Sequence, residues 1–192
     1  MEQNQPTKFM NKINKNHCAL LIIDMQEYFR AMAEPILPDL FPLIECCRQV
    51  ELPVIFTRHA HKDPLIDGGM LAKWWGEMII DGTSEAEILD ELKPRKNEKI
   101  IPKNRYSAFF QTDLHRHLQK CQIQQVIISG VMTNLCCETT ARDAFVHDYE
   151  VFFLTDGTAT SREDFHRATL LNLSYGFAHL KTCHEIYETI TS

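Results

Sequence analysis

"VIISGVMTNLCCETTARDAF", residues 126–145, places an apolar run, a glycine-led turn and a segment of helical character in immediate succession. The run at 126–130 is short and almost entirely apolar, as expected for a parallel strand that is covered on both faces. The segment at 135–147 has the length and pattern of an amphipathic helix. A strand that leads directly into a helix is the repeating unit of a parallel α/β sheet.

The same alternation continues along the whole chain. Apolar runs predict strands at residues 18–23, 53–57, 99–101, 126–130, 151–154 and 178–183. Amphipathic segments predict helices at 36–50, 84–92, 112–120, 135–147 and 162–175, the second of them with Ser84 and Glu87 as a capping box. This order predicts an α/β fold with a doubly wound, Rossmann-like six-stranded parallel sheet and helices on both faces.

Size and composition favour one domain. The 192 residues are 44% hydrophobic and 24% charged, which suits one sizeable core. Residues 1–17 are polar and rich in Lys and Asn, so we expect a polar N-terminal extension followed by a single domain at 18–192.

Charge and hydropathy restrict the expected partners. A net charge of −6 argues against a nucleic-acid or anionic membrane surface, because both require clustered Lys and Arg. Residues 1–17 lack the apolar core of a signal peptide, and no later run reaches the roughly 20 apolar residues that span a bilayer. The seven cysteines are an odd number, and the adjacent pairs are poorly placed for disulfides. We therefore expect a cytoplasmic protein with reduced thiols and a small-molecule substrate.

Chemically versatile side chains follow three of the predicted strands. Asp24 comes directly after 18–23, Lys103 follows 99–101, and Cys136 follows 126–130. Ligands bind outside the carboxyl ends of such strands, so a carboxylate base, an ammonium and a thiol would meet there. Each residue alone has an ordinary structural interpretation, as a cap, a surface charge or a small buried hydrophobe. Their convergence favours a cysteine hydrolase.

The two adjacent cysteines differ in their helical positions. On a helix that begins near Asn134, Cys137 shares a stripe with Ala141 and Ala144, which is typical of close packing on a sheet. Cys136 lies in the first turn, where unpaired N–H groups and the helix dipole are expected to lower the pKa of a thiol, with Lys103 adding to the effect. Cys136 is therefore the predicted nucleophile. The same N–H groups could receive an oxyanion.

Three segments carry a family resemblance. "LLIIDMQEYF", "KNRYSAF" and "GVMTNLCCETTARDAF" resemble, in order and spacing, the signature segments of the isochorismatase-like cysteine hydrolases, and the similarity extends over about residues 18–185. The resemblance implies an Asp-Lys-Cys triad of Asp24, Lys103 and Cys136, and the same six-stranded fold. It also implies a cis peptide bond between Val131 and Met132, an oxyanion hole made by the Met132 and Cys136 amides, and a homo-oligomer.

The resemblance extends to two branches with different chemistry. Nicotinamidase-like members hold a metal with an Asp-x-His pair after the second strand, whereas "FTRHAHKD" has His59 in place of the Asp. We therefore predict no metal and no other cofactor, although alternation would place His59 and His61 on one face, where they could ligate zinc or iron. "KNRYSAF", "TTARDAF" and "LTDGTA" resemble the isochorismatase branch, whose classical vinyl-ether hydrolases have glycine at the position of Cys136.

Several residues are candidates for binding the substrate. Trp74 and Trp75 could floor or cover a pocket for a flat ligand, or could lie in a subunit interface. His59 is expected to make a polar contact with the substrate. Tyr106, in "KNRYSAF", is expected to contact it as well.

Three classes of function remain open at this point. The first is a hydrolase that cleaves a small amide or related C–N bond through a cysteine thioester. The second is a vinyl-ether hydrolase of the isochorismatase type, which needs an acid and a base but no thiol. The third is a catalytically silent binding protein, which would be expected to lack one member of the triad, and none is missing.

Overall fold

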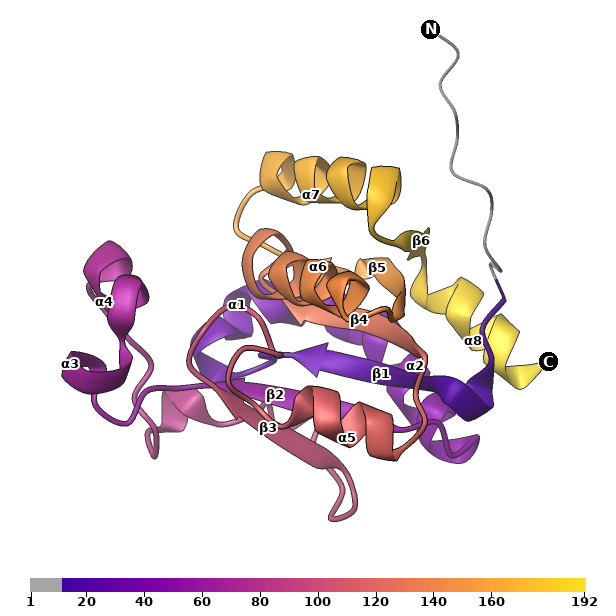
Figure 1. The fold of residues 1–192 in the computed structure, drawn as a ribbon, viewed down its shortest axis with the longest axis horizontal. Coiled ribbons are helices and arrows are strands. Elements are labelled where there is room, and N and C mark those ends of the chain that lie inside the picture. The colour runs from indigo at the N-terminus through magenta and orange to yellow at the C-terminus, as the bar shows by residue number, and fades with distance from the viewer. Residues whose placement is uncertain (1–11) are drawn as a thin grey trace, which may run out of the picture.

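A parallel sheet forms the centre of the molecule (Figure 1). The computed structural model describes residues 12–192. The strands are β1 (Cys18–Ile23), β2 (Val54–His59), β3 (Lys99–Lys103), β4 (Gln125–Val131), β5 (Glu150–Ala159) and β6 (His179–Lys181). They lie in the order β3-β2-β1-β4-β5-β6, and all neighbours are parallel. The winding reverses beside β1, so the sheet is doubly wound, as predicted.

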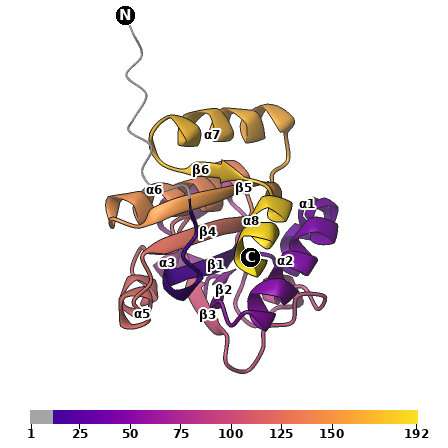
Figure 2. The same ribbon diagram turned by 90° about the vertical axis from the view of Figure 1, so that its right-hand side faces the viewer.

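Helices cover both faces of the sheet (Figure 2). They are α1 (Arg30–Ala33), α2 (Leu37–Gln49), α3 (Pro64–Asp67), α4 (Gly69–Trp75), α5 (Leu114–Lys120), α6 (Glu138–Val146), α7 (Glu163–Gly176) and α8 (Cys183–Thr191). Short turns are η1 (Lys15–His17), η2 (Glu27–Phe29), η3 (Glu34–Ile36), η4 (Ser84–Ala86) and the π-helical turn η5 (Thr133–Cys137). α3 and α4 project from the body of the molecule beyond the carboxyl ends of the strands (Figure 1).

The central strand β1 is fixed by apolar packing on both sides. All six of its residues are fully buried. Leu20 and Ile22 belong to the layer that includes α2 and α8, whereas Leu21 and Ile23 belong to the layer that includes α5 and α6. Burying each such side chain contributes about 1.5–3 kcal/mol. The carboxyl end of β1, where Asp24 follows, is therefore held rigidly.

The predicted helix at 84–92 is wrong beyond its first turn. Helical structure ends after η4, and Glu87 is extended. The amide of Glu27 donates to the carbonyl of Glu87, and the amide of Leu89 donates to the carbonyl of Met25. Pairing with the segment after β1 replaces the helical hydrogen bonds that the capping-box pattern suggested. The capping box in the structure is Thr182 with Glu185, at the start of α8.

The ends of the chain differ from expectation in two respects. The strand predicted at 178–183 is shorter, because α8 already begins at Cys183. Of the predicted polar extension at 1–17, residues 1–11 lie outside the described residues, and Lys15–His17 form η1. No helix within residues 12–192 has the length and apolar character that crossing a membrane requires.

A close backbone approach at Gly130 generates a test of the fold. Gly130 has φ +107, and an added Cβ would overlap the carbonyl oxygen of Ile23 in β1. Gly130→Ala is expected to lower the free energy of unfolding by about 3 kcal/mol or more, through strain and displacement of β1. Gly82→Ala is the matched control, with φ +84 but open space around the new Cβ. It should cost about 1 kcal/mol.

Urea denaturation of both variants measures the difference. Equal losses of stability at the two glycines would contradict the close packing of β4 against β1.

Candidate active site

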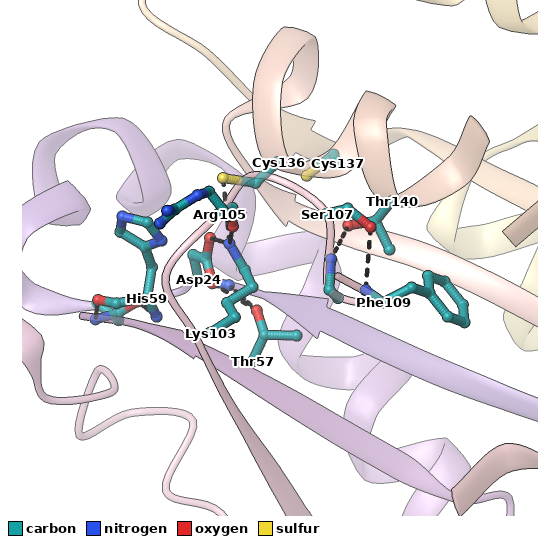
Figure 3. A network of polar contacts seen from close by, with 12 residues as sticks. Asp24, Thr57, His59, Lys103, Arg105, Ser107, Phe109, Cys136, Cys137 and Thr140 are labelled. Carbon is teal, nitrogen blue, oxygen red and sulfur yellow. Dashed lines mark hydrogen bonds and ion pairs between the residues drawn. The ribbon is translucent and has the colours of Figure 1, made fainter. Parts of the chain in front are cut away.

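Asp24, Lys103 and Cys136 meet at the carboxyl edge of the sheet (Figure 3). Lys103 Nζ lies 2.6 Å from Asp24 Oδ2 and donates to Cys136 Sγ at 3.4 Å. Asp24 directly follows β1, Lys103 ends β3, and Cys136 lies in η5 after β4. The side chains of Asp24 and Lys103 are completely buried. The three residues singled out in the sequence are therefore brought together by three different strands.

Asp24 is oriented by the neighbouring strand β2. Its backbone has φ +47, the left-handed region that Asp tolerates better than most residues. The hydroxyl of Thr57 donates to Asp24 Oδ1 at 2.5 Å and accepts the amide of Asp24 at 3.0 Å. Oδ1 is thus held by Thr57, while Oδ2 faces Lys103. The sequence offered one signal for Thr57, a single hydroxyl in an otherwise apolar strand, but its role was missed.

Burial and the neighbouring opposite charge shift the pKa of Lys103, and likewise that of Cys136, in opposite directions. Burial alone would lower the pKa of Lys103, but Asp24 and Cys136 outweigh it and raise the pKa. Lys103 is therefore an ammonium. Burial raises the pKa of the Cys136 thiol to about 12, and the adjacent Asp24 carboxylate adds to this, while Lys103 opposes it. The lowered thiol pKa expected from the sequence is wrong for the free protein, because desolvation exceeds the attraction of Lys103.

The two cysteines face different surroundings. Cys137 is fully buried, and its Sγ lies 3.9 Å from the carbonyl oxygen of Ser129 in β4. Cys136 lines a cavity of about 590 Å³.

The peptide bond between Val131 and Met132 is cis. Instead of a regular helix start, η5 has the amides of Leu135 and Cys137 both donating to the carbonyl of Met132 at 3.1 Å.

The turn that carries Cys136 is held by the segment around α7. Thr160 Oγ1 donates to Asn134 Oδ1 at 2.6 Å, and Thr133 Oγ1 lies 3.0 Å from His166 Nδ1. Thr169 Oγ1 donates to the Glu138 carboxylate at 2.7 Å. These contacts connect segments that are distant in the sequence, so periodicity alone gave no signal for them. They hold η5 and the start of α6 against the segment around α7.

Three of the four predicted substrate contacts line the cavity. They are His59, Trp75 and Tyr106, and Trp75 Nε1 donates to Tyr106 Oη at 2.8 Å. Trp74 differs from the expectation, because it is not part of the lining and 76% of its surface is exposed. On the short helix α4 the two adjacent tryptophans point in different directions, and only Trp75 turns toward the cavity.

His59 is positioned by Gln26, a residue that the sequence interpretation missed. Gln26 is fully buried; its amide group donates to the carbonyls of His59 and Ala86, and its oxygen accepts the amide of His59 at 2.7 Å. Burial, with a contribution from Lys103, lowers the pKa of His59 to about 4. His59 is therefore neutral at physiological pH. The only sequence signal for the role of Gln26 was its position two residues after Asp24.

His59, at the end of β2, and His61, two residues later, differ from the ligand set that the resemblance expects for a nicotinamidase-like metal site. The rings of His59 and His61 are 5.2 Å apart at an angle of 80°. His61 Nδ1 lies 3.0 Å from Asp67 Oδ1, whereas His59 occupies the position where the resemblance expects an aspartate. Within residues 12–192, no three His, Cys, Asp or Glu side chains come together in a metal-binding arrangement.

Comparison with known proteins identifies the family. The family model described as "Isochorismatase domain" matches residues 18–185, which is most of the chain. The chain belongs to the isochorismatase family. This isochorismatase-family protein is a hydrolase, and its doubly wound sheet is the fold of that family. The predicted resemblance is confirmed.

Individual relatives span more than one activity. The chain is 48% identical over 180 residues to Nicotinamidase 3 of Arabidopsis thaliana, covering 92% of this chain and 90% of that protein. It is 33% identical over 162 residues to an isochorismatase of Bacillus subtilis, covering 81% of this chain and 52% of that protein. A cysteine hydrolase from Pseudomonas syringae pv. phaseolicola has a similar structure, with a TM-score of 0.89, 26% identity, and coverage of 93% and 94% of the two chains.

The raised pKa of Cys136 generates a test on the free enzyme. In a Cys137→Ala background, alkylation of Cys136 by iodoacetamide should accelerate about tenfold per pH unit from about pH 7 to about pH 10, because the thiolate fraction still rises in this range. An unperturbed thiol levels off above about pH 8.5. Peptide mass spectrometry measures the rate at Cys136. A plateau at or below about pH 9 would mean that Lys103 outweighs burial.

Proposed function

We propose that this protein is a cysteine hydrolase that cleaves a small-molecule amide, or a related C–N bond, through a thioester on Cys136. The contact of Lys103 with both Asp24 and Cys136, of which Cys136 lines the cavity, is the observation that carries the proposal. The similarity to Nicotinamidase 3 supports an amide as the substrate and makes nicotinamide the first compound to test.

The first half-reaction forms the thioester. Asp24 accepts the thiol proton of Cys136, and Sγ attacks the carbonyl carbon of the amide. The carbonyl oxygen becomes an oxyanion, which the backbone amides of Met132 and Cys136 receive. Lys103 remains an ammonium and stabilises the anionic groups beside it. Because the thiol is protonated in the free enzyme, proton transfer to Asp24 accompanies the attack rather than preceding substrate binding.

The second half-reaction returns the enzyme to its starting state. As the tetrahedral intermediate collapses, Asp24 gives its proton to the departing nitrogen, the C–N bond breaks, and ammonia or an amine leaves. Asp24 then takes a proton from water, and the resulting hydroxide attacks the thioester carbon. The C–S bond breaks, the carboxylic acid is released, and the proton on Asp24 restores the thiol. One carboxylate thus serves both half-reactions.

The lining of the cavity suits a flat substrate. Trp75 and Tyr106 provide aromatic surface in the lining, and the neutral His59 offers one hydrogen-bond donor and one acceptor. The volume of about 590 Å³ lies within the range of small-molecule sites.

A vinyl-ether hydrolase of the isochorismatase type is the second candidate function. The similarity to the isochorismatase of Bacillus subtilis favours it, and Asp24 and Lys103 alone would suffice for the chemistry. Isochorismate carries two carboxylates, however, and no Lys or Arg is part of the cavity lining within the described residues. Arg58, the basic residue beside His59, is paired with Asp81 at 2.7 Å.

A catalytically silent binding protein is disfavoured because all three reactive groups are present and in contact.

The domain boundaries, the cellular compartment and the oligomeric state are also proposals. We place residues 18–192 in one hydrolase domain, acting in the cytoplasm as a homo-oligomer. Free thiols at all seven cysteines support a reducing compartment. Exposed apolar side chains on α3 and α4, including Leu65 and Ile66, support self-association. Light scattering after size-exclusion chromatography would test the oligomer.

The covalent mechanism predicts opposite outcomes for the two cysteines. Cys136→Ala should lower kcat/KM by about four powers of ten, because removing one member of a unit removes nearly the whole covalent rate. Cys137→Ala should retain activity within about tenfold and lose stability by about 1 kcal/mol, since it removes only packing.

Ammonia release from nicotinamide and a panel of small aromatic and aliphatic amides measures turnover. If Cys136→Ala retains near-normal ammonia release from any amide that the wild-type enzyme cleaves, the thioester is excluded.

A further inference from the structure

The cavity wall includes the aromatic rings of two tyrosines, a phenylalanine and a tryptophan. Tyr28 and Phe29, both in η2, pack edge to face with ring centres 5.0 Å apart. Trp75, at the end of α4, is joined to Tyr106 by the indole hydrogen bond. These four rings come from three separate segments of the chain. Tyrosine and tryptophan faces attract cations through the ring quadrupole.

The one charged side chain in the cavity lining within the described residues is acidic. This side chain is Glu77, which is exposed and is separated from the end of α4 by Gly76. Lys103 contacts Cys136 from outside the lining, and its positive charge is compensated by Asp24 at 2.6 Å. His59 is uncharged at physiological pH. The cavity therefore presents a carboxylate without a compensating cation in its wall.

Basic side chains near the cavity are engaged elsewhere. Arg58 pairs with Asp81, and neither residue is part of the lining. Arg105 donates to the backbone carbonyl of Asp67 at 2.6 Å and packs against Gly69, beneath α3 and α4. Both guanidinium groups thus have partners outside the cavity lining, although the charge of Arg105 still contributes to lowering the pKa of His59.

From the aromatic wall and the exposed carboxylate we infer that the cavity prefers a carboxamide carried on a cationic flat ring, and that Glu77 is the residue that selects this charge. The class is an N-alkylated pyridinium carboxamide or a ring of equivalent charge and shape. The inference rests on the proposed function, because it names the substrate class of the same site. An exposed carboxylate contributes modestly, so the selectivity assigned to Glu77 is a few-fold rather than absolute.

Three ligands of nearly equal size test the preference. They are the 1-methyl-3-carbamoylpyridinium cation, the neutral 3-methylbenzamide and the anionic 3-carbamoylbenzoate, which differ mainly in charge. Binding to the Cys136→Ala variant, measured by isothermal titration calorimetry, avoids turnover. The expected order of affinity is cation, neutral, anion. Adding Glu77→Gln to the Cys136→Ala variant should reduce the ratio of its affinity for the cation to its affinity for the neutral ligand about threefold.

Glu85→Gln in the same Cys136→Ala background is the matched control. Glu85 is an exposed glutamate on η4 that is not part of the lining, so its variant has the same net charge as Glu77→Gln. Its affinity ratio should not change. The inference is overturned if Glu77→Gln leaves the ratio unchanged, if Glu85→Gln lowers it equally, if the anion binds as tightly as the cation, or if none of the three ligands binds.

Ammonia release by the wild-type enzyme separates this inference from the proposed function. Turnover of amides with an unchanged affinity ratio would overturn the charge selection and leave the hydrolase standing. A ratio that falls as expected, with no ammonia released from any of the amides, would confirm the cation site and overturn the amide hydrolase.

Discussion

The Lys103 ammonium lies 2.6 Å from the Asp24 carboxylate, and neither side chain has any surface exposed to solvent. Two charges taken out of water must compensate each other, and removing one partner of such a pair typically costs about 3–5 kcal/mol. The carboxyl ends of β1 and β3 must therefore stay in register, although β2 lies between them. Thr57, from β2, holds the second carboxylate oxygen and completes the arrangement. These contacts join the carboxyl ends of β1, β2 and β3.

The same pair determines the state of the thiol. Cys136 lies against an ammonium whose charge is already matched by Asp24, so burial dominates and the thiol stays protonated. A resting thiol beside a carboxylate is suited to attack coupled to proton transfer, and it is protected from the indiscriminate reactions of a free thiolate. The contacts of Asn134 and Thr133 with the segment around α7 keep Cys136 in the cavity lining. Stability and reactivity thus depend on one set of contacts.

Much of this was predictable from the sequence. Apolar runs located all six strands, although β3 and β6 are only partly buried, and Asp24, Lys103 and Cys136 stood out because each follows such a run. Interactions between distant segments could not be read in the same way. The helix predicted at 84–92 gives way to pairing with the segment after β1. The pKa of Cys136 depends on desolvation, which no local pattern records. The orientation of Trp74, away from the cavity, depends on how α4 projects from the body.

The central claim is that Cys136 bonds covalently to the acyl group of an amide while Asp24 and Lys103 remain paired beside it. Rapid-quench intact-mass spectrometry during turnover tests it most directly. The account predicts a transient mass increase equal to the acyl group, located by peptide mapping on Cys136 and absent in the Cys136→Ala variant. Substrate consumption by the wild-type enzyme with no acylated species at any quench time, or with the acyl group on Cys137, would contradict it.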